Sequence, residues 1–76
     1  MRKKQLAQRL AKRIREERGD TPQMHFCRKL GISNTSLHRI EMGDQNVSLK
    51  TLEVLCERLK CDVGDLFPPL EGKSDS

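Results

Sequence analysis

The sequence predicts an all-α domain of five short helices, and three observations predict it. Apolar residues recur at three- and four-residue spacing, which is the periodicity of helices that bury one face. Residues that start helices and glycines that end them cut this pattern into short segments. No stretch alternates apolar and polar side chains as a half-buried strand does. The length of 76 residues suits one domain with one core.

The first two helices are separated by a clear stop and start signal. The first is predicted to run to about Arg18, where Gly19 ends it. Its apolar face consists of Leu6, Ala7, Leu10, Ala11 and Ile14. Thr21 is predicted to cap the second helix, with Pro22 at its first helical position and Gly31 at its end. The apolar residues of the second helix are Phe26, Cys27 and Leu30.

The remaining three helices begin at residues suited to capping. Ser33 is predicted to cap the third helix (about 33–42), which turns Leu37 and Ile40 inward before Gly43 closes it. Ser48 is predicted to cap the fourth helix, and Asp62 the last short turn. The apolar residues of these two segments are Leu49, Leu52, Val54, Leu55, Cys56 and Leu59, then Val63, Leu66 and Phe67. The domain therefore covers residues 6–67, between a basic N-terminal arm (1–5) and a tail (68–76) that we expect to be disordered.

Charge and composition narrow the class of partner. The formal net charge is +4, and residues 1–18 hold eight basic side chains against Glu16 and Glu17. Such a basic end suits a polyanion such as DNA, RNA or anionic lipid, although a solvated helix face gives the same pattern. No apolar run approaches a membrane span or a signal peptide, which predicts a cytoplasmic chain with no membrane partner.

Three cysteines provide no obvious cofactor site. Cys27, Cys56 and Cys61 are odd in number and lack the C-x-x-C spacing of a zinc site. Cys27 and Cys56 fall on apolar helix faces, where a thiol acts as a small hydrophobe. The sequence therefore predicts reduced cysteines, no metal and no cofactor.

The connection between the second and third helices has the length of a helix-turn-helix unit. Gly31 allows the sharp turn and Ile32 can fill the angle between the helices. The third helix then starts with outward polar side chains: Asn34, Thr35, Ser36 and His38. A helix start carries free N–H groups and partial positive charge, which suits phosphates and the major groove. Ser, Thr and Asn also favour helix starts simply because they cap, so this feature alone leaves both interpretations open.

Ordered motifs carry a family resemblance. With Gln23 near the start of the second helix, LGIS at the turn, IEMG at the end of the third helix and then NVSLKTLEVLCERLKCDVGDLF, the chain resembles the XRE-type repressor family of phage Cro and repressor proteins. The resemblance covers residues 6–67 in order. It implies a five-helix, repressor-like DNA-binding domain and a sequence-specific transcriptional regulator, a repressor, that places its third helix in the major groove of double-stranded DNA.

The resemblance also implies site residues. The positions that reach base edges are matched by Asn34, Thr35 and Arg39, with Ser33 and His38 as neighbouring candidates. The expected contacts to the DNA backbone come from Gln23, Ser36, Gln45 and Asn46, and from Arg2, Lys3 and Lys4 of the arm. A structural ion pair is expected between Arg15 and Glu41. Two-fold operators imply a homodimer on palindromic DNA, with residues 63–70 as the expected dimer surface.

Other functions compete with this interpretation. An enzyme is disfavoured, because Ser36 with His38 and Cys27 with His25 are each two apart on a helix and point in different directions. RNA binding is disfavoured by the near absence of aromatic stacking residues. The alternative function for the same fold is binding to another protein, either as an interaction adaptor or as an antitoxin-type partner. It would be favoured if salt bridges occupied the first helix and left no basic face.

Overall fold

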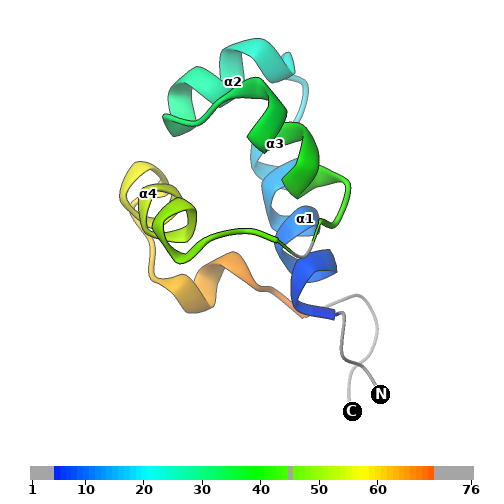
Figure 1. Cartoon of the computed structure of the whole chain (residues 1–76), viewed down its shortest axis with the longest axis vertical. Coiled ribbons are helices and arrows are strands. Elements are labelled where there is room, and N and C mark those ends of the chain that lie inside the picture. Colours follow the sequence, from blue (N-terminus) through cyan, green and yellow to red (C-terminus); the bar gives the residue numbers. More distant parts are fainter. Residues whose placement is uncertain (1–4, 45, 70–76) are drawn as a thin grey trace.

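The computed structural model describes residues 5–44 and 46–69. Within them the chain forms four α-helices and one 3-10 turn, with no strand. The elements in order are α1 (Gln5–Arg18), α2 (Gln23–Leu30), α3 (Asn34–Glu41), α4 (Leu49–Leu59) and η1 (Val63–Leu66). The all-α prediction is confirmed. In Figure 1, α2 and α3 meet at one end of the molecule, and η1 leads from α4 back toward α1.

The predicted count of five helices is wrong for the part of the chain described here. The last segment is a single 3-10 turn, in which the Asp65 N–H donates to the Asp62 carbonyl at 2.9 Å. It does not lengthen because Pro68 follows closely, and the residue before a proline is disfavoured in the helical region. Phe67 accordingly lies at φ −123° and ψ 67°.

One core joins all of these elements. α1 packs on α3 and η1, while α2 packs on α3 and α4. The six largest fully buried side chains are Phe26, Ile14, Leu30, Leu37, Leu55 and Leu66. Three residues expected on apolar faces are instead mostly exposed: Leu6, Leu49 and Val63. Each is the first or second residue of its element, so its own helix or turn covers it from one side only.

The predicted caps differ in outcome. Ser33 accepts a hydrogen bond from the Ser36 N–H at 3.0 Å, and Ser48 accepts one from the Thr51 N–H at 3.1 Å, so both caps are confirmed. The Thr21 cap is wrong. Pro22, which is in extended conformation, takes the N-cap position of α2 without a side-chain bond. Proline cannot donate an N–H, and here its carbonyl supplies the first acceptor of the helix instead.

The C-terminal ends of α2, α3 and α4 share one geometry. A residue with positive φ follows each helix, namely Gly31 (φ 73°), Gly43 (φ 84°) and Lys60 (φ 54°). The next backbone N–H then returns to the carbonyl five residues back, from Ile32 to Cys27, from Asp44 to Arg39 and from Cys61 to Cys56. This Schellman motif brings the first and last side chains of the turn together. It therefore determines which side chains meet at each helix end.

Two arginines of α1 hold the segment after η1. Arg9 donates to the carbonyls of Pro68 (3.0 Å) and Phe67 (2.6 Å), and Arg13 donates to the carbonyl of Asp65 (2.6 Å). The packed part of the chain thus reaches Pro68, one residue past the predicted end of the domain. At the other end, Gln5 already belongs to α1 rather than to the arm. The rest of the predicted arm (1–4) and tail (70–76) lies outside the described residues.

None of the helices among the described residues has both the length and the apolar character needed to cross a membrane.

Candidate nucleic-acid interface

The turn between α2 and α3 holds the two helices at a fixed angle. Gly31 adopts the left-handed conformation (φ 73°, ψ 27°), which a residue with a side chain adopts only at a cost. Ile32 packs against the core beside the turn. Leu37 (0% exposed) and Ile40 (3% exposed) anchor α3 from below. The predicted helix-turn-helix unit is therefore present, with the other face of α3 turned outward.

The outward face of α3 carries the predicted base-contacting residues. All five are exposed: Ser33, Asn34, Thr35, His38 and Arg39. Ser33 is also occupied locally, because its hydroxyl caps the helix and donates to the Ser36 hydroxyl at 3.0 Å. Ser36 is half-buried, so its contribution to a contact surface is limited.

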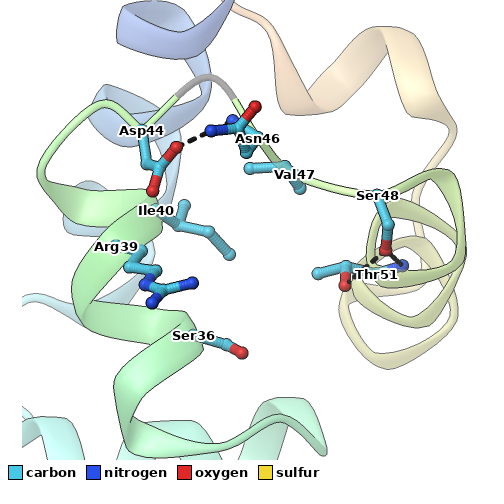
Figure 2. Close-up of a pocket in the computed structure, with 8 residues that line it drawn as sticks. All are labelled: Ser36, Arg39, Ile40, Asp44, Asn46, Val47, Ser48 and Thr51. Atoms are coloured by element: carbon cyan, nitrogen blue, oxygen red, sulfur yellow. Dashed lines mark hydrogen bonds between the residues drawn. The ribbon is translucent and has the colours of Figure 1, made fainter.

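A shallow hollow of about 110 Å³ opens between α3, the following loop and the start of α4 (Figure 2). Its lining residues are Ser36, Arg39, Ile40, Asp44, Asn46, Val47, Ser48 and Thr51. The Asp44 carboxylate accepts the Asn46 N–H at 2.8 Å, which shapes the loop. The Ser48 and Thr51 hydroxyls lie 3.0 Å apart at the start of α4. The positive end of α4 and the Arg39 side chain thus border one concave surface, which suits an anionic ligand, while the Asp44 carboxylate adds a negative charge at its edge.

Sequence reasoning missed part of this hollow. The sequence predicts Ser48 only as a cap and indicates no role for Thr51. Their helix-start positions next to the predicted backbone-contacting loop were the available signal. Asn46 lies where it was expected, in the loop after α3. Gln45, Arg2, Lys3 and Lys4, also predicted to contact the DNA backbone, lie outside the described residues.

The Glu41 carboxylate is the centre of a buried polar cluster at the end of α3. Glu41 is 8% exposed. Arg18 donates to both carboxylate oxygens, at 2.7 and 3.0 Å, and the Gln23 amide donates to one of them at 3.0 Å. This hydrogen bonding to Glu41 raises the pKa of Arg18 above its ordinary value. Three elements, α1, α2 and α3, therefore meet at one carboxylate.

The predicted ion pair between Arg15 and Glu41 is wrong in its choice of arginine. Arg18 makes the pair, and Arg15 instead donates to the backbone carbonyl of Glu41 at 2.7 Å. The two arginines are three apart on α1 and so lie on the same side of the helix. The one further along the chain reaches the carboxylate, while the other caps the end of α3.

Glu41→Gln is expected to lower the free energy of unfolding by about 1–3 kcal/mol, because hydrogen bonds to a charged group are stronger than those to a neutral amide. The measurement is thermal unfolding followed by circular dichroism. Glu16→Gln is the matched control, since Glu16 pairs with Lys12 on the surface of α1 and surface pairs contribute little. Equal changes in the two variants would show that the Glu41 cluster stabilises nothing beyond a surface pair.

The basic residues of α1 are engaged within the chain. All five described ones make an ion pair or a hydrogen bond with another residue: Arg9, Lys12, Arg13, Arg15 and Arg18. The basic side chains of α1 are therefore largely used for contacts within the chain. Such an engaged first helix favours a protein-interaction adaptor over a DNA-binding protein. Arg15 is exposed although it donates to Glu41, and the other exposed positive charges among the described residues lie on the later helices and their ends, at Arg28, Lys29, Arg39, Lys50, Arg58 and Lys60.

The comparison with known families favours DNA binding. The sequence matches the Cro/C1-type HTH DNA-binding domain over residues 1–69. The chain belongs to this family. The predicted XRE-type resemblance is confirmed, and the Cro/C1-type domain is placed among DNA-binding transcriptional regulators.

Two curated proteins are similar to this Cro/C1-type domain. Control protein C.MunI from a Mycoplasma species is 33% identical over 60 residues, which cover 79% of this chain and 81% of that protein. Antitoxin PezA from Streptococcus pneumoniae is 34% identical over 47 residues, which cover 62% of this chain but 30% of the antitoxin. The chain thus corresponds to less than a third of the antitoxin. No solved structure matches.

Proposed function

We propose that this Cro/C1-type domain is a cytoplasmic repressor that binds a palindromic operator in double-stranded DNA as a homodimer. The observation that carries the proposal is the polar, exposed start of α3 above a buried Leu37 and Ile40, within a helix-turn-helix of this family. The start of α3 enters the major groove in this proposal. The rest of the domain fixes the angle at which α3 is presented.

Base contacts come from the outward face of α3. Asn34 is suited to adenine, Thr35 offers a hydroxyl and a methyl group to thymine, and Arg39 has the bidentate geometry that guanine accepts. Ser33 and His38 flank them and complete the proposed reading surface. The exposure of all five side chains supports these roles, because no rearrangement of α3 is needed to present them.

Backbone contacts come from the rim of the hollow beside α3. Asn46, Ser48 and Thr51 offer polar groups at the start of α4, and the half-buried Ser36 borders the same hollow. The Gln23 amide uses one N–H on Glu41, so a second N–H remains for a phosphate. Gln45 and the arm residues Arg2, Lys3 and Lys4 are proposed as further backbone contacts.

The dimer surface is proposed on the side of α4 and η1. Val63, the first residue of the expected dimer segment, is 52% exposed, and Leu49 is 79% exposed. Both line an open hollow together with Leu52 and Cys56. Burying such apolar side chains against a second copy would remove them from water. The proposal therefore extends the expected surface (63–70) onto α4.

The test of this function is binding selection from a random double-stranded DNA pool at two salt concentrations. We expect a palindromic motif whose half-sites are about one DNA turn apart. Affinity for that motif should fall steeply with salt, because phosphate contacts release counterions. A motif without two-fold symmetry would contradict the homodimer, and the absence of any motif would contradict sequence-specific reading.

Removing the charges of Arg2, Lys3 and Lys4 tests the arm separately. The slope of log K against log salt counts the ions released on binding. In the triple alanine variant this slope is expected to fall in magnitude by up to about three per protomer, while the selected motif stays the same. Lys29→Ala, Arg58→Ala and Lys60→Ala combined provide a charge-matched control on exposed positions away from the start of α4. A slope equal to that of the unaltered chain would show that the arm does not contact DNA.

Binding to a partner protein is a second proposed function, because the basic residues of α1 are engaged in folding contacts. The similarity to an antitoxin is consistent with it. Recovery of no DNA motif, with only weak salt-sensitive binding, would favour this second function over the first.

A further inference from the structure

The turn at the end of α4 brings two cysteines together. Lys60 adopts the left-handed conformation (φ 54°, ψ 52°), and the N–H groups of Lys60 and Cys61 both donate to the Cys56 carbonyl. The bond from Cys61 is the six-residue bond of the Schellman motif, in which the residue at the start of the turn contacts the residue after it, and the bond from Lys60 is that of the simpler left-handed cap. In α4 those two residues are Cys56 and Cys61. The same geometry at the end of α2 pairs Cys27 with Ile32 instead.

The backbone distance is short enough for a disulfide bridge. The Cys61 nitrogen lies 3.0 Å from the Cys56 carbonyl oxygen. Adding the covalent reach from each of these atoms to its own Cα limits the Cα–Cα distance to about 6.9 Å at most. Disulfides join Cα atoms that are roughly 4.4–6.8 Å apart. The native turn therefore keeps the two Cα atoms no further apart than about the upper limit of the bridging range.

The two thiols are also free and partly accessible. Cys56 and Cys61 are both half-buried, and neither is in a disulfide. Cys56 lines the open hollow on the side of α4 and η1, so a small molecule can reach it in a single chain, before a second copy covers that hollow. Cys27 differs, because it is 7% exposed and its thiol donates to the Met24 carbonyl at 3.2 Å. The three cysteines are therefore not equivalent toward a reagent in solution.

We propose that Cys56 and Cys61 form a dithiol modification site, which a small-molecule disulfide such as glutathione disulfide oxidises to a bridge within one chain. The Cys56 thiolate attacks one glutathione sulfur, which forms a mixed disulfide and releases one glutathione. The Cys61 thiolate then attacks the Cys56 sulfur and releases the second glutathione. Two protein thiols are oxidised and one glutathione disulfide is reduced to two glutathiones. The bridge joins the last turn of α4 to the segment that enters η1.

The surroundings of Cys61 determine how this step depends on pH. Partial burial raises the pKa of the Cys61 thiol; Arg13 opposes this rise, while Cys56, Asp65 and Glu17 add to it. Because the thiolate is the reacting form, the second step is expected to speed up as the pH rises from about 7 to 9.

The test treats the full folded chain with glutathione disulfide, blocks the remaining thiols by alkylation after unfolding, and digests with trypsin. We expect the peptide of residues 51–58, which contains Cys56, joined to the peptide of residues 61–73, which contains Cys61. The peptide of residues 19–28 should carry alkylated Cys27. Separate glutathione adducts on Cys56 and Cys61, or bridges to Cys27 or to a second chain, would overturn the proposal.

Two further measurements distinguish the native turn from a chance encounter of nearby thiols. Lys60→Gly keeps the left-handed turn and should preserve the rate of bridging, whereas Lys60→Val disfavours that conformation and should slow it severalfold. The bridged chain should also melt at a higher temperature than the reduced chain, as a bridge that fits the native backbone restricts the unfolded state. A lower melting temperature, or equal rates in the two Lys60 variants, would contradict a site built by the turn. Cys61→Ser is the chemical control and should stop at the Cys56 adduct.

Discussion

Replacing Arg39 by alanine is expected to weaken binding to the selected operator by about 1–3 kcal/mol per half-site, while binding to random DNA changes much less. Arg39 is exposed on α3, on the face proposed to contact bases, and it also lines the hollow beside that helix (Figure 2). Asn34→Ala should behave in the same way, because Asn34 starts the helix on the same exposed face. The measurement is a pair of titrations at one salt concentration, with operator DNA and with scrambled DNA.

Arg39→Lys is the matched variant, since lysine keeps the charge but loses the planar, bidentate donor geometry of arginine. If Arg39 contacts a base, the lysine variant should lose most of the preference for the operator. If Arg39 contacts only a phosphate, the lysine variant should bind nearly as well as the unaltered chain. Equal losses for Arg39→Ala on operator and scrambled DNA would likewise show a contact to the DNA backbone, which would contradict the proposed base contact.

Leu37→Ala is expected to lower the free energy of unfolding by about 2–5 kcal/mol, because it removes buried methyl groups and leaves a cavity beneath α3. Leu37 is 0% exposed and belongs to the cluster that also contains Ile14 and Phe26. For a domain of this size such a loss corresponds to a fall in melting temperature of at least about 10 °C. Thermal and urea unfolding followed by circular dichroism measure it.

Leu49→Ala is the control for this change. The same side chain is removed, but Leu49 is 79% exposed and should alter the stability of the monomer by less than about 0.5 kcal/mol. Leu49→Ala should instead weaken the proposed self-association, which sedimentation at several protein concentrations would detect. A large fall in the stability of the monomer for Leu49→Ala, or a small one for Leu37→Ala, would contradict the packing described here.

Much of the fold follows from chemistry that is local in the chain. Ser33 and Ser48 bond to N–H groups three residues ahead, and Gly31 supplies a positive φ that few residues tolerate, so short motifs are enough to locate these turns. The inward positions of α3 follow from helical periodicity, which places Leu37 and Ile40 on one face. The exposed polar residues at the start of α3 lie on the opposite side of the helix from Leu37 and Ile40. The candidate site could therefore be located from the sequence along most of α3.

The remaining features depend on contacts between segments distant in the sequence. Periodicity places Arg15 and Arg18 on the same side of α1, but only the packing of α1 on α3 determines that Arg18 meets the Glu41 carboxylate. Charge counting likewise predicts a basic first helix, yet its arginines are used to hold the Glu41 cluster and the backbone after η1. The guanidinium of an arginine can donate to a carboxylate, a carbonyl or a phosphate. The packing of the helices determines which of these acceptors lies within about 3 Å of a given arginine, and that acceptor becomes its partner.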